Sequence, residues 1–274
     1  MYSQTQRNSV LIERVNIISN REVAHNIWEM YFKAPELISE YKGPGQFINI
    51  LVEDSWNHPL RRPMSIASAK NGKVSIIYKT FGDVTKILSK KEPNDNMEIL
   101  GPLGNTFTNW NIDCYPILVG GGVGIPPLLN LKSECERNSI NHSIIIGARN
   151  SNEHFMTHQP EKNIILTTDD GSFGEAGTVM NPIDRIVKEK NKPYIFACGP
   201  EPMLIAIRDY ALMNGIPAQL SVESYMGCGV GFCQGCVISK NTKSHKDNSY
   251  HEQYSLVCLD GPIYEAEDIK FEQS

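Results

Sequence analysis

Four cysteines in the last fifth of the chain have a spacing that binds iron. Cys228, Cys233 and Cys236 follow the pattern Cys-x4-Cys-x2-Cys, and Cys258 lies further along. This is the plant-type spacing of ligands for a [2Fe–2S] cluster, in which four thiolates hold two bridged irons. A loop that curls tightly around a cluster needs unusual backbone dihedrals, which glycine adopts without steric cost. Four glycines alternate with these cysteines: Gly227, Gly229, Gly231 and Gly235. We therefore predict a [2Fe–2S] cluster here.

Two other interpretations of these cysteines remain open. A structural zinc site usually carries two Cys-x2-Cys pairs, whereas only Cys233 and Cys236 form one here. Buried free thiols are the second alternative, but cysteines that are packed for bulk need no interleaved glycines. Three further cysteines are interpreted as core or near-site thiols: Cys114, Cys135 and Cys198.

A segment with two arginines has the chemistry to bind a flavin. Arg62-Pro63-Met64-Ser65 follows a barrel-like strand, where an arginine can pair with pyrophosphate and a hydroxyl can bond a flavin or phosphate. Taken alone, Arg61-Arg62 is more often an ordinary surface pair. Tyr78-Lys79-Thr80-Phe81-Gly82 accompanies it, followed by Thr85 at an expected helix start, which is a ready anion site. Together these segments predict a flavin site.

A glycine-rich turn joins an expected strand to an expected helix. The run from Gly120 to Pro127, GGGVGIPP, would let the backbone approach a diphosphate at a helix N-terminus. It departs from the dinucleotide fingerprint Gly-x-Gly-x-x-Gly, because Pro127 replaces the third glycine. Cys198-Gly199-Pro200 and Asp169-Asp170-Gly171-Ser172 follow other expected strands, and ligands of open α/β sheets bind at such ends. The alternative is a turn that only makes a tight strand-to-helix connection.

Two kinds of domain must position these residues. Before residue 112, short segments rich in β-branched and aromatic residues, separated by turns such as Asn71-Gly72, favour a small antiparallel barrel with a helix over 83–89. From Tyr115, apolar runs suited to a parallel sheet alternate with expected helices at 182–190 and 202–214, the second capped by Gly215. We predict a β-barrel at 1–112, an α/β domain at 113–220 and a cluster domain at 221–274.

The composition restricts the class of protein. Of 274 residues, 41% are hydrophobic and 21% are charged, which is ordinary for a globular protein. The net charge of −5 argues against a dedicated binder of nucleic acid or of anionic membranes. No apolar run reaches the length of a membrane span, and the N-terminus lacks the apolar core of a signal peptide. We therefore expect a cytoplasmic protein.

The ordered set of motifs resembles one known superfamily. Arg62-Pro63-Met64-Ser65, GGGVGIPPL, ACGPEPML and ESYMGCGVGFCQGC, in that order, resemble the ferredoxin-reductase superfamily. Within it, the chain is similar over essentially its whole length to the electron-transfer subunits of NAD-dependent (class 1B) dihydroorotate dehydrogenases. The resemblance implies an FAD-binding six-stranded barrel, an α/β nicotinamide-binding domain and a C-terminal [2Fe–2S] domain. It implies a set of residues near FAD: Arg62, Pro63, Met64, Ser65, Tyr78, Lys79, Gly82, Thr85 and the flavin neighbour Glu223. It implies a second set that lines the NAD site: Gly122, Gly124, Cys198, Gly199 and Met203.

The resemblance also implies a partner. In such a complex, dihydroorotate is oxidised at FMN in a catalytic subunit, and electrons pass through the cluster and FAD to NAD, in pyrimidine biosynthesis. A heterotetramer of two plus two subunits is expected, with an apolar docking face around the cysteine loop. Two alternatives stay open. One is a subunit of an NAD(P)H:ferredoxin or sulfur/hydrogenase-type oxidoreductase, and the other is a non-catalytic interaction module held by zinc.

Two segments depart from the family pattern. The family usually carries Gly-x-Gly-Thr where this chain has Gly82-Asp83-Val84-Thr85, so the side chain of Val84 is expected to crowd a close phosphate approach. The spacer before Cys258 is longer than the family norm, which suggests a surface insertion at 237–257 with His245 and His251 as solvated loop residues. Arg149 could serve NADP, but the carboxylates of Asp169 and Asp170 would repel its extra phosphate, so NAD is expected.

Overall fold

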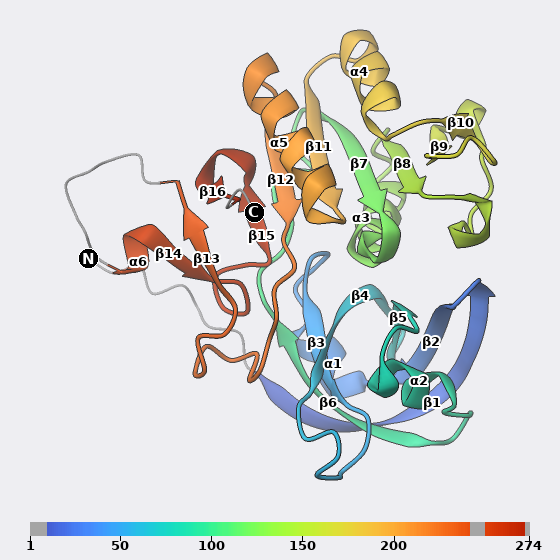
Figure 1. The fold of residues 1–274 in the computed structure, drawn as a ribbon, viewed down its shortest axis with the longest axis vertical. Helices are drawn as coiled ribbons and strands as arrows, with labels where there is room; N and C mark the ends of the chain where they lie inside the picture. Colours follow the sequence, from blue (N-terminus) through green and yellow to red (C-terminus); the bar gives the residue numbers. More distant parts are fainter. Residues whose placement is uncertain (1–9, 242–249, 272–274) are drawn as a thin grey trace.

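The computed structural model describes residues 10–241 and 250–271. These residues form a closed six-stranded barrel, a seven-stranded sheet with helices, and a small three-stranded sheet. Figure 1 shows the barrel at the bottom, the seven-stranded sheet above it, and the three-stranded sheet beside both. The predicted fold class, an antiparallel barrel followed by a parallel-sheet domain and a small cluster domain, is confirmed.

The barrel closes in the order β1-β2-β5-β4-β3-β6, with every strand antiparallel to its neighbours. Asn71 and Gly72 join β4 to β5 with φ of 54° and 72°, the left-handed pair that a tight hairpin requires, as the sequence predicts. The predicted helix over 83–89 is present as α2. The elements are β1 (Leu11–Ala24), β2 (Ile27–Lys33), α1 (Pro35–Glu40), β3 (Phe47–Leu51), β4 (Arg62–Lys70), β5 (Lys73–Lys79), α2 (Asp83–Ser89) and β6 (Asn96–Leu103).

The second domain is a sheet in the order β10-β9-β8-β7-β11-β12-β15, parallel except for β15. Its central strands are buried on both faces, which is why they read as continuous apolar runs. Gly215 ends α5 with φ of 63°, the predicted left-handed cap. The elements are β7 (Tyr115–Gly121), η1 (Gly122–Gly124), α3 (Pro126–Arg137), β8 (Ser143–Ala148), η2 (Ser151–Glu153), η3 (Pro160–Lys162), β9 (Ile164–Thr168), β10 (Glu175–Ala176), α4 (Met180–Glu189), β11 (Pro193–Cys198), α5 (Glu201–Asn214) and β12 (Ala218–Ser221).

The C-terminal segment contributes to two sheets. Three of its strands form the small sheet β14-β13-β16, whereas β15 pairs antiparallel with β12 and extends the seven-stranded sheet. Part of the expected insertion at 237–257 is therefore regular structure, while His245 lies outside the described residues. The domain boundaries stay a prediction. The elements are β13 (Val237–Lys240), α6 (Tyr250–Gln253), β14 (Tyr254–Leu256), β15 (Ile263–Glu265), η4 (Ala266–Asp268) and β16 (Ile269–Lys270).

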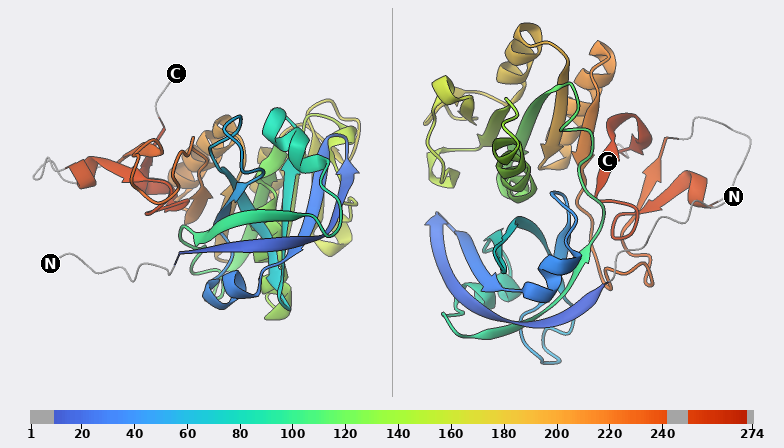
Figure 2. Two further views of the ribbon diagram at one scale, coloured as in Figure 1. Left: turned by 90° about the horizontal axis from the view of Figure 1, so that it is seen from below. Right: turned by 180° about the vertical axis from the view of Figure 1, so that it is seen from behind.

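Helix α3 connects the seven-stranded sheet to the barrel. Its buried Asn130 donates hydrogen bonds to the Tyr41 hydroxyl (2.6 Å) and to the Ile66 carbonyl of β4 (3.1 Å). Burial also raises the pKa of Tyr41, so its hydroxyl stays protonated. Both views in Figure 2 show the barrel against the α/β domain on one side of the molecule and the C-terminal strands on the other. The barrel and the sheet are thereby held in one arrangement, with cavities between them.

Candidate cofactor and cluster sites

The four predicted cluster cysteines lie in one loop region as two pairs. In the first pair, the N–H of Cys228 donates to Cys233 Sγ (3.5 Å), and the N–H of Cys233 donates to Cys228 Sγ (3.3 Å). In the second pair, the N–H of Cys258 donates to Cys236 Sγ (3.5 Å). Cys228 is close enough to Cys258 for charge repulsion between the two thiolates to raise the pKa of Cys258, so the two pairs are neighbours. The first pair reaches the surface, and the second is buried.

The backbone around the first pair favours thiolates. The N–H groups of Val230 and Gly235 donate to Cys228 Sγ and Cys233 Sγ, each at 3.5 Å. Hydrogen bonds from the backbone of Cys228 and Gly235 lower the pKa of Cys233 to about 7, whereas burial raises the pKa of Cys258 to about 12. Such N–H donors also stabilise the sulfurs of a bound cluster.

The paired arrangement of the cysteines bears on the kind of metal centre that they would hold. Among residues 10–241 and 250–271, no group of three or more His, Cys, Asp or Glu side chains surrounds a single metal position. A mononuclear zinc site needs four ligands around one point, whereas two bridged irons take two thiolates each. The two neighbouring pairs of cysteines therefore suit the two irons of a [2Fe–2S] cluster.

A first cavity lies between the barrel and the α/β domain, with a volume of about 420 Å³. It combines polar groups, Ser65 and Lys79, with an apolar wall that suits a flat aromatic ring system. Phe81 lines it and is itself 93% exposed. The cavity brings together most of the residues expected for FAD: Pro63, Met64, Ser65, Tyr78, Lys79 and Glu223.

The other residues expected for FAD lie outside this lining. Arg62 donates to the Leu60 carbonyl (2.9 Å) from the start of β4. The Thr85 hydroxyl accepts from the N–H groups of Phe81 (2.8 Å) and Gly82 (3.2 Å), and so closes the start of α2. Val84 is buried in the barrel core rather than exposed at the helix start. The side chain of Val84 thus packs inward, and its expected crowding of a phosphate stays a prediction. The roles of Arg62, Gly82 and Thr85 stay predictions.

Glu223 follows β12 at the edge of the first cavity. Its carboxyl is accessible from the open cavity, yet it is surrounded by protein on the other sides, and this desolvation raises its pKa. It lies close enough to Cys198 to raise the pKa of that buried thiol further, although burial is the larger cause. Glu223 is also five positions before Cys228, so one short segment joins the first cavity to the cluster loop.

A second cavity of about 600 Å³ lies at the carboxyl ends of β7, β8, β9 and β11. This is the edge at which open α/β sheets bind ligands. Gly122 and Met203, which are predicted to contact NAD, line it, and so do Arg149 and Asp169. The Thr167 hydroxyl is buried in its lining and has no hydrogen-bond partner among the described residues. A buried hydroxyl without a partner fits a cavity that receives a polar ligand.

Three other residues expected for NAD, Gly124, Cys198 and Gly199, are not among the residues that line the second cavity. They make the close backbone contacts next to it. A β-carbon on Gly124 would lie 2.5 Å from the Cys198 carbonyl, so η1 packs directly on the end of β11. A β-carbon on Gly199 would lie 2.5 Å from Met203 Cε and 3.1 Å from the Gly121 nitrogen. Gly124 and Gly199 therefore allow two strand ends to touch, and Met203 covers the contact. Whether Gly124, Cys198 and Gly199 contact NAD stays a prediction.

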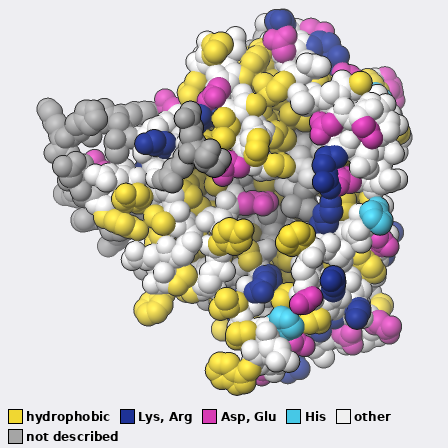
Figure 3. Space-filling model, viewed as in Figure 1, with side chains coloured by type: hydrophobic (Ala, Val, Ile, Leu, Met, Phe, Trp, Pro, Cys, Tyr) yellow, Lys and Arg dark blue, Asp and Glu magenta, His cyan; other side chains and the backbone are white. Residues whose placement is uncertain are grey.

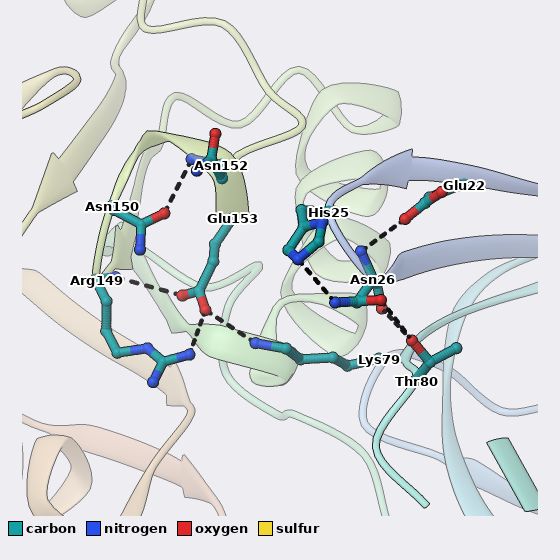
Figure 4. Close-up of polar contacts among 9 residues, drawn as sticks. All are labelled: Glu22, His25, Asn26, Lys79, Thr80, Arg149, Asn150, Asn152 and Glu153. Carbon is teal, nitrogen blue, oxygen red and sulfur yellow. Dashed lines mark hydrogen bonds and ion pairs between the residues drawn. The ribbon is translucent and has the colours of Figure 1, made fainter. Parts of the chain in front are cut away.

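Sequence reasoning missed Glu153, at the end of η2. Its carboxylate accepts hydrogen bonds from Arg149 Nη2 (2.5 Å) and from Lys79 Nζ (2.9 Å), as Figure 4 shows. The Arg149 guanidinium and then Lys79 hold the pKa of Glu153 at about 2, well below its usual range. Lys79 comes from the barrel and lines both cavities, so this ion pair crosses between the domains. A single glutamate after a strand belongs to no motif, which is why the sequence did not single it out.

Comparisons with known proteins agree with this geometry. A family described as the iron-sulfur cluster binding domain of dihydroorotate dehydrogenase B matches residues 223–270. Among solved structures, the NADH-dependent reduced ferredoxin-NADP oxidoreductase superposes with a TM-score of 0.79 at 26% identity, covering 93% of this chain and 89% of that one. The ferredoxin reductase of carbazole 1,9a-dioxygenase, at 17% identity and a TM-score of 0.62, covers 76% of this chain and 67% of its own, and shares the fold.

Curated relatives cover nearly the whole chain. The dihydroorotate dehydrogenase B (NAD(+)) electron transfer subunit of Bacillus pumilus is 34% identical over 93% of this chain and 96% of its own length. The subunit of the same name from Fusobacterium nucleatum is 33% identical over 95% of this chain and 99% of its own. With the cluster cysteines and both cavities in place, the chain belongs to the family of electron transfer subunits of dihydroorotate dehydrogenase B (NAD(+)).

Proposed function

We propose that this chain is the electron-transfer subunit of an NAD-dependent dihydroorotate dehydrogenase in pyrimidine biosynthesis. It would take electrons from a catalytic subunit and deliver them to NAD by way of a [2Fe–2S] cluster and FAD. The family membership supports this proposal. None of the helices within the described residues is long and apolar enough to cross a membrane. We place the complex in the cytoplasm, where thiols stay reduced.

The observation that carries the proposal is the contiguity of the three sites. The segment from Glu223 to Cys228 connects the first cavity to the cluster loop, and Lys79 lines both the first and the second cavity. The cluster loop also packs on the barrel, where Gly229 lies against Asn49 and Leu103. A chain that moves electrons between carriers must hold the carriers side by side, so the contiguity of the three sites supports this function.

Each site has a defined task in the proposed function. The cluster carries one electron at a time, whereas FAD can exchange single electrons or a hydride with a nicotinamide. Cys228, Cys233, Cys236 and Cys258 hold the iron. Ser65 and Lys79 offer polar contacts to the flavin, while Met203 of α5 lines the nucleotide cavity. The described residues thus bind and orient, and dihydroorotate chemistry is left to the partner.

An apolar surface around the cluster loop suits the docking of this partner. Tyr225 is 95% exposed and Phe232 is 89% exposed, although both are large and apolar, and Val230 and Leu259 are exposed beside them. Figure 3 shows hydrophobic side chains on this face, on the left of the view. Exposed apolar patches next to a redox centre favour a protein partner. We propose that an FMN-containing catalytic subunit docks here and that the complex contains two copies of each subunit.

The test uses the anaerobically purified chain with and without its catalytic subunit. We expect about two irons and one FAD per chain, with a visible spectrum that NADH bleaches. With the catalytic subunit added, dihydroorotate should bleach the same spectrum, whereas the chain alone should not respond to dihydroorotate. Bleaching by reduced ferredoxin but not by dihydroorotate with its catalytic subunit would instead favour a ferredoxin-linked oxidoreductase, as in the similar solved structure.

A further inference from the structure

The nucleotide cavity contains two cations that are already paired. Lys79 and Arg149 both line it, and both donate to the carboxylate of Glu153, at 2.9 Å and 2.5 Å. The Arg149 backbone N–H also faces this carboxylate, at 3.4 Å. Asp169, at the end of the next strand, adds a second negative charge near Arg149. The cations of the cavity are therefore neutralised before a ligand arrives.

Contacts from both domains fix the position of Glu153. The Asn150 side chain accepts from the N–H of Asn152 (3.1 Å) and caps η2, which carries Glu153. The N–H of His25, at the β1–β2 turn of the barrel, donates to the Asn152 carbonyl (3.1 Å). The Glu153 side chain is only 12% exposed. Figure 4 shows it between Arg149 and Lys79, pointing toward both. Its low pKa, caused mainly by Arg149, keeps it ionised at neutral pH.

Charge is what distinguishes the two nicotinamide dinucleotides. NADP differs from NAD by one phosphate on the adenosine ribose, which carries between one and two negative charges at neutral pH. Proteins bind such a phosphate with arginine and lysine, through charge-assisted hydrogen bonds. In this cavity a phosphate would have to displace Glu153 from Arg149 or Lys79, and would meet the repulsion of a fixed carboxylate.

We infer that Glu153 makes the nucleotide cavity select a dinucleotide without a 2′-phosphate, by occupying the two cations that would otherwise bind that phosphate. The inference rests on the proposed nucleotide-binding role of the second cavity. It adds a specificity-determining residue that acts through charge pairing and contacts the cations rather than the nicotinamide.

The test measures binding of two adenosine probes to the full chain, loaded with FAD and iron, by calorimetry. Adenosine 5′-monophosphate represents NAD, and adenosine 2′,5′-bisphosphate adds the distinguishing phosphate. In the native chain the monophosphate should bind more tightly. Glu153→Gln keeps the size of the side chain but removes its charge, so the ratio of the two affinities should shift toward the bisphosphate by about tenfold or more, as expected for one charged hydrogen bond. The shift should shrink as salt concentration rises.

Three further variants assign the effect. Glu153→Asp retains the charge and should retain the preference. Adding Arg149→Ala to Glu153→Gln should remove most of the gain. Glu175 pairs with Arg185 at 2.7 Å outside the cavity, so Glu175→Gln should leave the ratio unchanged.

Two results would overturn the inference, and they are distinguishable. If both probes bind but Glu153→Gln leaves their ratio unchanged, Glu153 does not set the preference, while the nucleotide site stands. If neither probe binds to the native chain or to the variant, the second cavity is not a nucleotide site, and the proposed NAD function fails with the inference.

Discussion

The side-chain amide of Asn49 occupies the space in which a β-carbon on Gly229 would stand. Asn49 belongs to β3 and is fully buried, and neither atom of its amide has a hydrogen-bond partner among the described residues. Its register partner in β4 is Pro63, which lines the first cavity. Gly229 follows Cys228, a predicted ligand of the cluster. The barrel and the cluster loop therefore meet through these two residues, next to the predicted flavin site.

This contact predicts that a methyl group at Gly229 disturbs the cluster. Gly229→Ala must displace Asn49 and must also hold φ of 73°. Overpacking of this kind costs about 1–3 kcal/mol of unfolding free energy. The matched control is Gly72→Ala, which has nearly the same φ of 72° but open space around the new methyl group. We expect Gly229→Ala to lose iron and labile sulfide while Gly72→Ala retains both. Equal iron contents in the two variants would show that the close approach is unimportant.

The pairing of the cysteines predicts which thiols are needed for iron. Cys258→Ser should abolish or strongly reduce the cluster, because the second iron would lose one of its two thiolates. Cys135 is equally buried but lies in α3, away from the cluster loop, so Cys135→Ser should retain the full iron content. Visible absorption and iron analysis distinguish the outcomes. Full iron content in Cys258→Ser would contradict the assignment of this ligand.

Local patterns in the sequence predicted most of the elements around the sites. The bounds of α2 and β7, the hairpin at Asn71-Gly72 and the cap at Gly215 follow from turn chemistry and periodicity, which act over a few residues. The spacing of the cysteines likewise predicts the cluster ligands. Strand β15 could not be predicted, because three residues have no periodicity, and its pairing with β12 depends on tertiary contact across more than forty residues.

The polar contacts between the domains were also beyond prediction from the sequence. Glu153 acquires its role only because the barrel brings Lys79 to the end of β8. Asn130 acquires its role because α3 packs against β4. Neither residue stands in a motif. By contrast, Val84 was expected to crowd a phosphate, since its family position usually holds glycine. Its burial in the barrel core shows that helix phase, and not residue size alone, decides where such a side chain points.

The hydrogen bonds of Asn130 predict a large effect on stability. Asn130→Ala leaves the Ile66 carbonyl and the Tyr41 hydroxyl without their donor inside the interface between the domains. An unsatisfied buried polar group costs about 1–3 kcal/mol. We therefore expect the free energy of unfolding, measured in urea, to fall by at least that amount. Asn138→Ala is the control, because Asn138 ends the same helix but is exposed, and its side-chain amide donates to the Glu134 carbonyl of the same helix. Similar losses in the two variants would contradict an anchoring role for Asn130.

The ion pairs of Glu153 predict how stability depends on pH. Its folded-state pKa of about 2 lies below the ordinary value of 4.5, so the ionised form stabilises the folded chain. This contribution is complete above pH 4.5 and is lost progressively as pH falls toward 2. Because Arg149 is 73% exposed and water screens the pair, we expect a contribution of about 1 kcal/mol rather than the full shift.

The measurement is the free energy of unfolding of the native chain and of Glu153→Gln, between pH 7 and pH 3. The native chain should be more stable at pH 7, and the difference should shrink below pH 4.5, since the glutamine variant has no carboxylate to protonate at this position. Comparing the two chains cancels the acid sensitivity of the remaining carboxylates and of the cluster. A difference that stayed constant down to pH 3 would mean that packing, and not the charge of Glu153, holds the barrel to the end of β8.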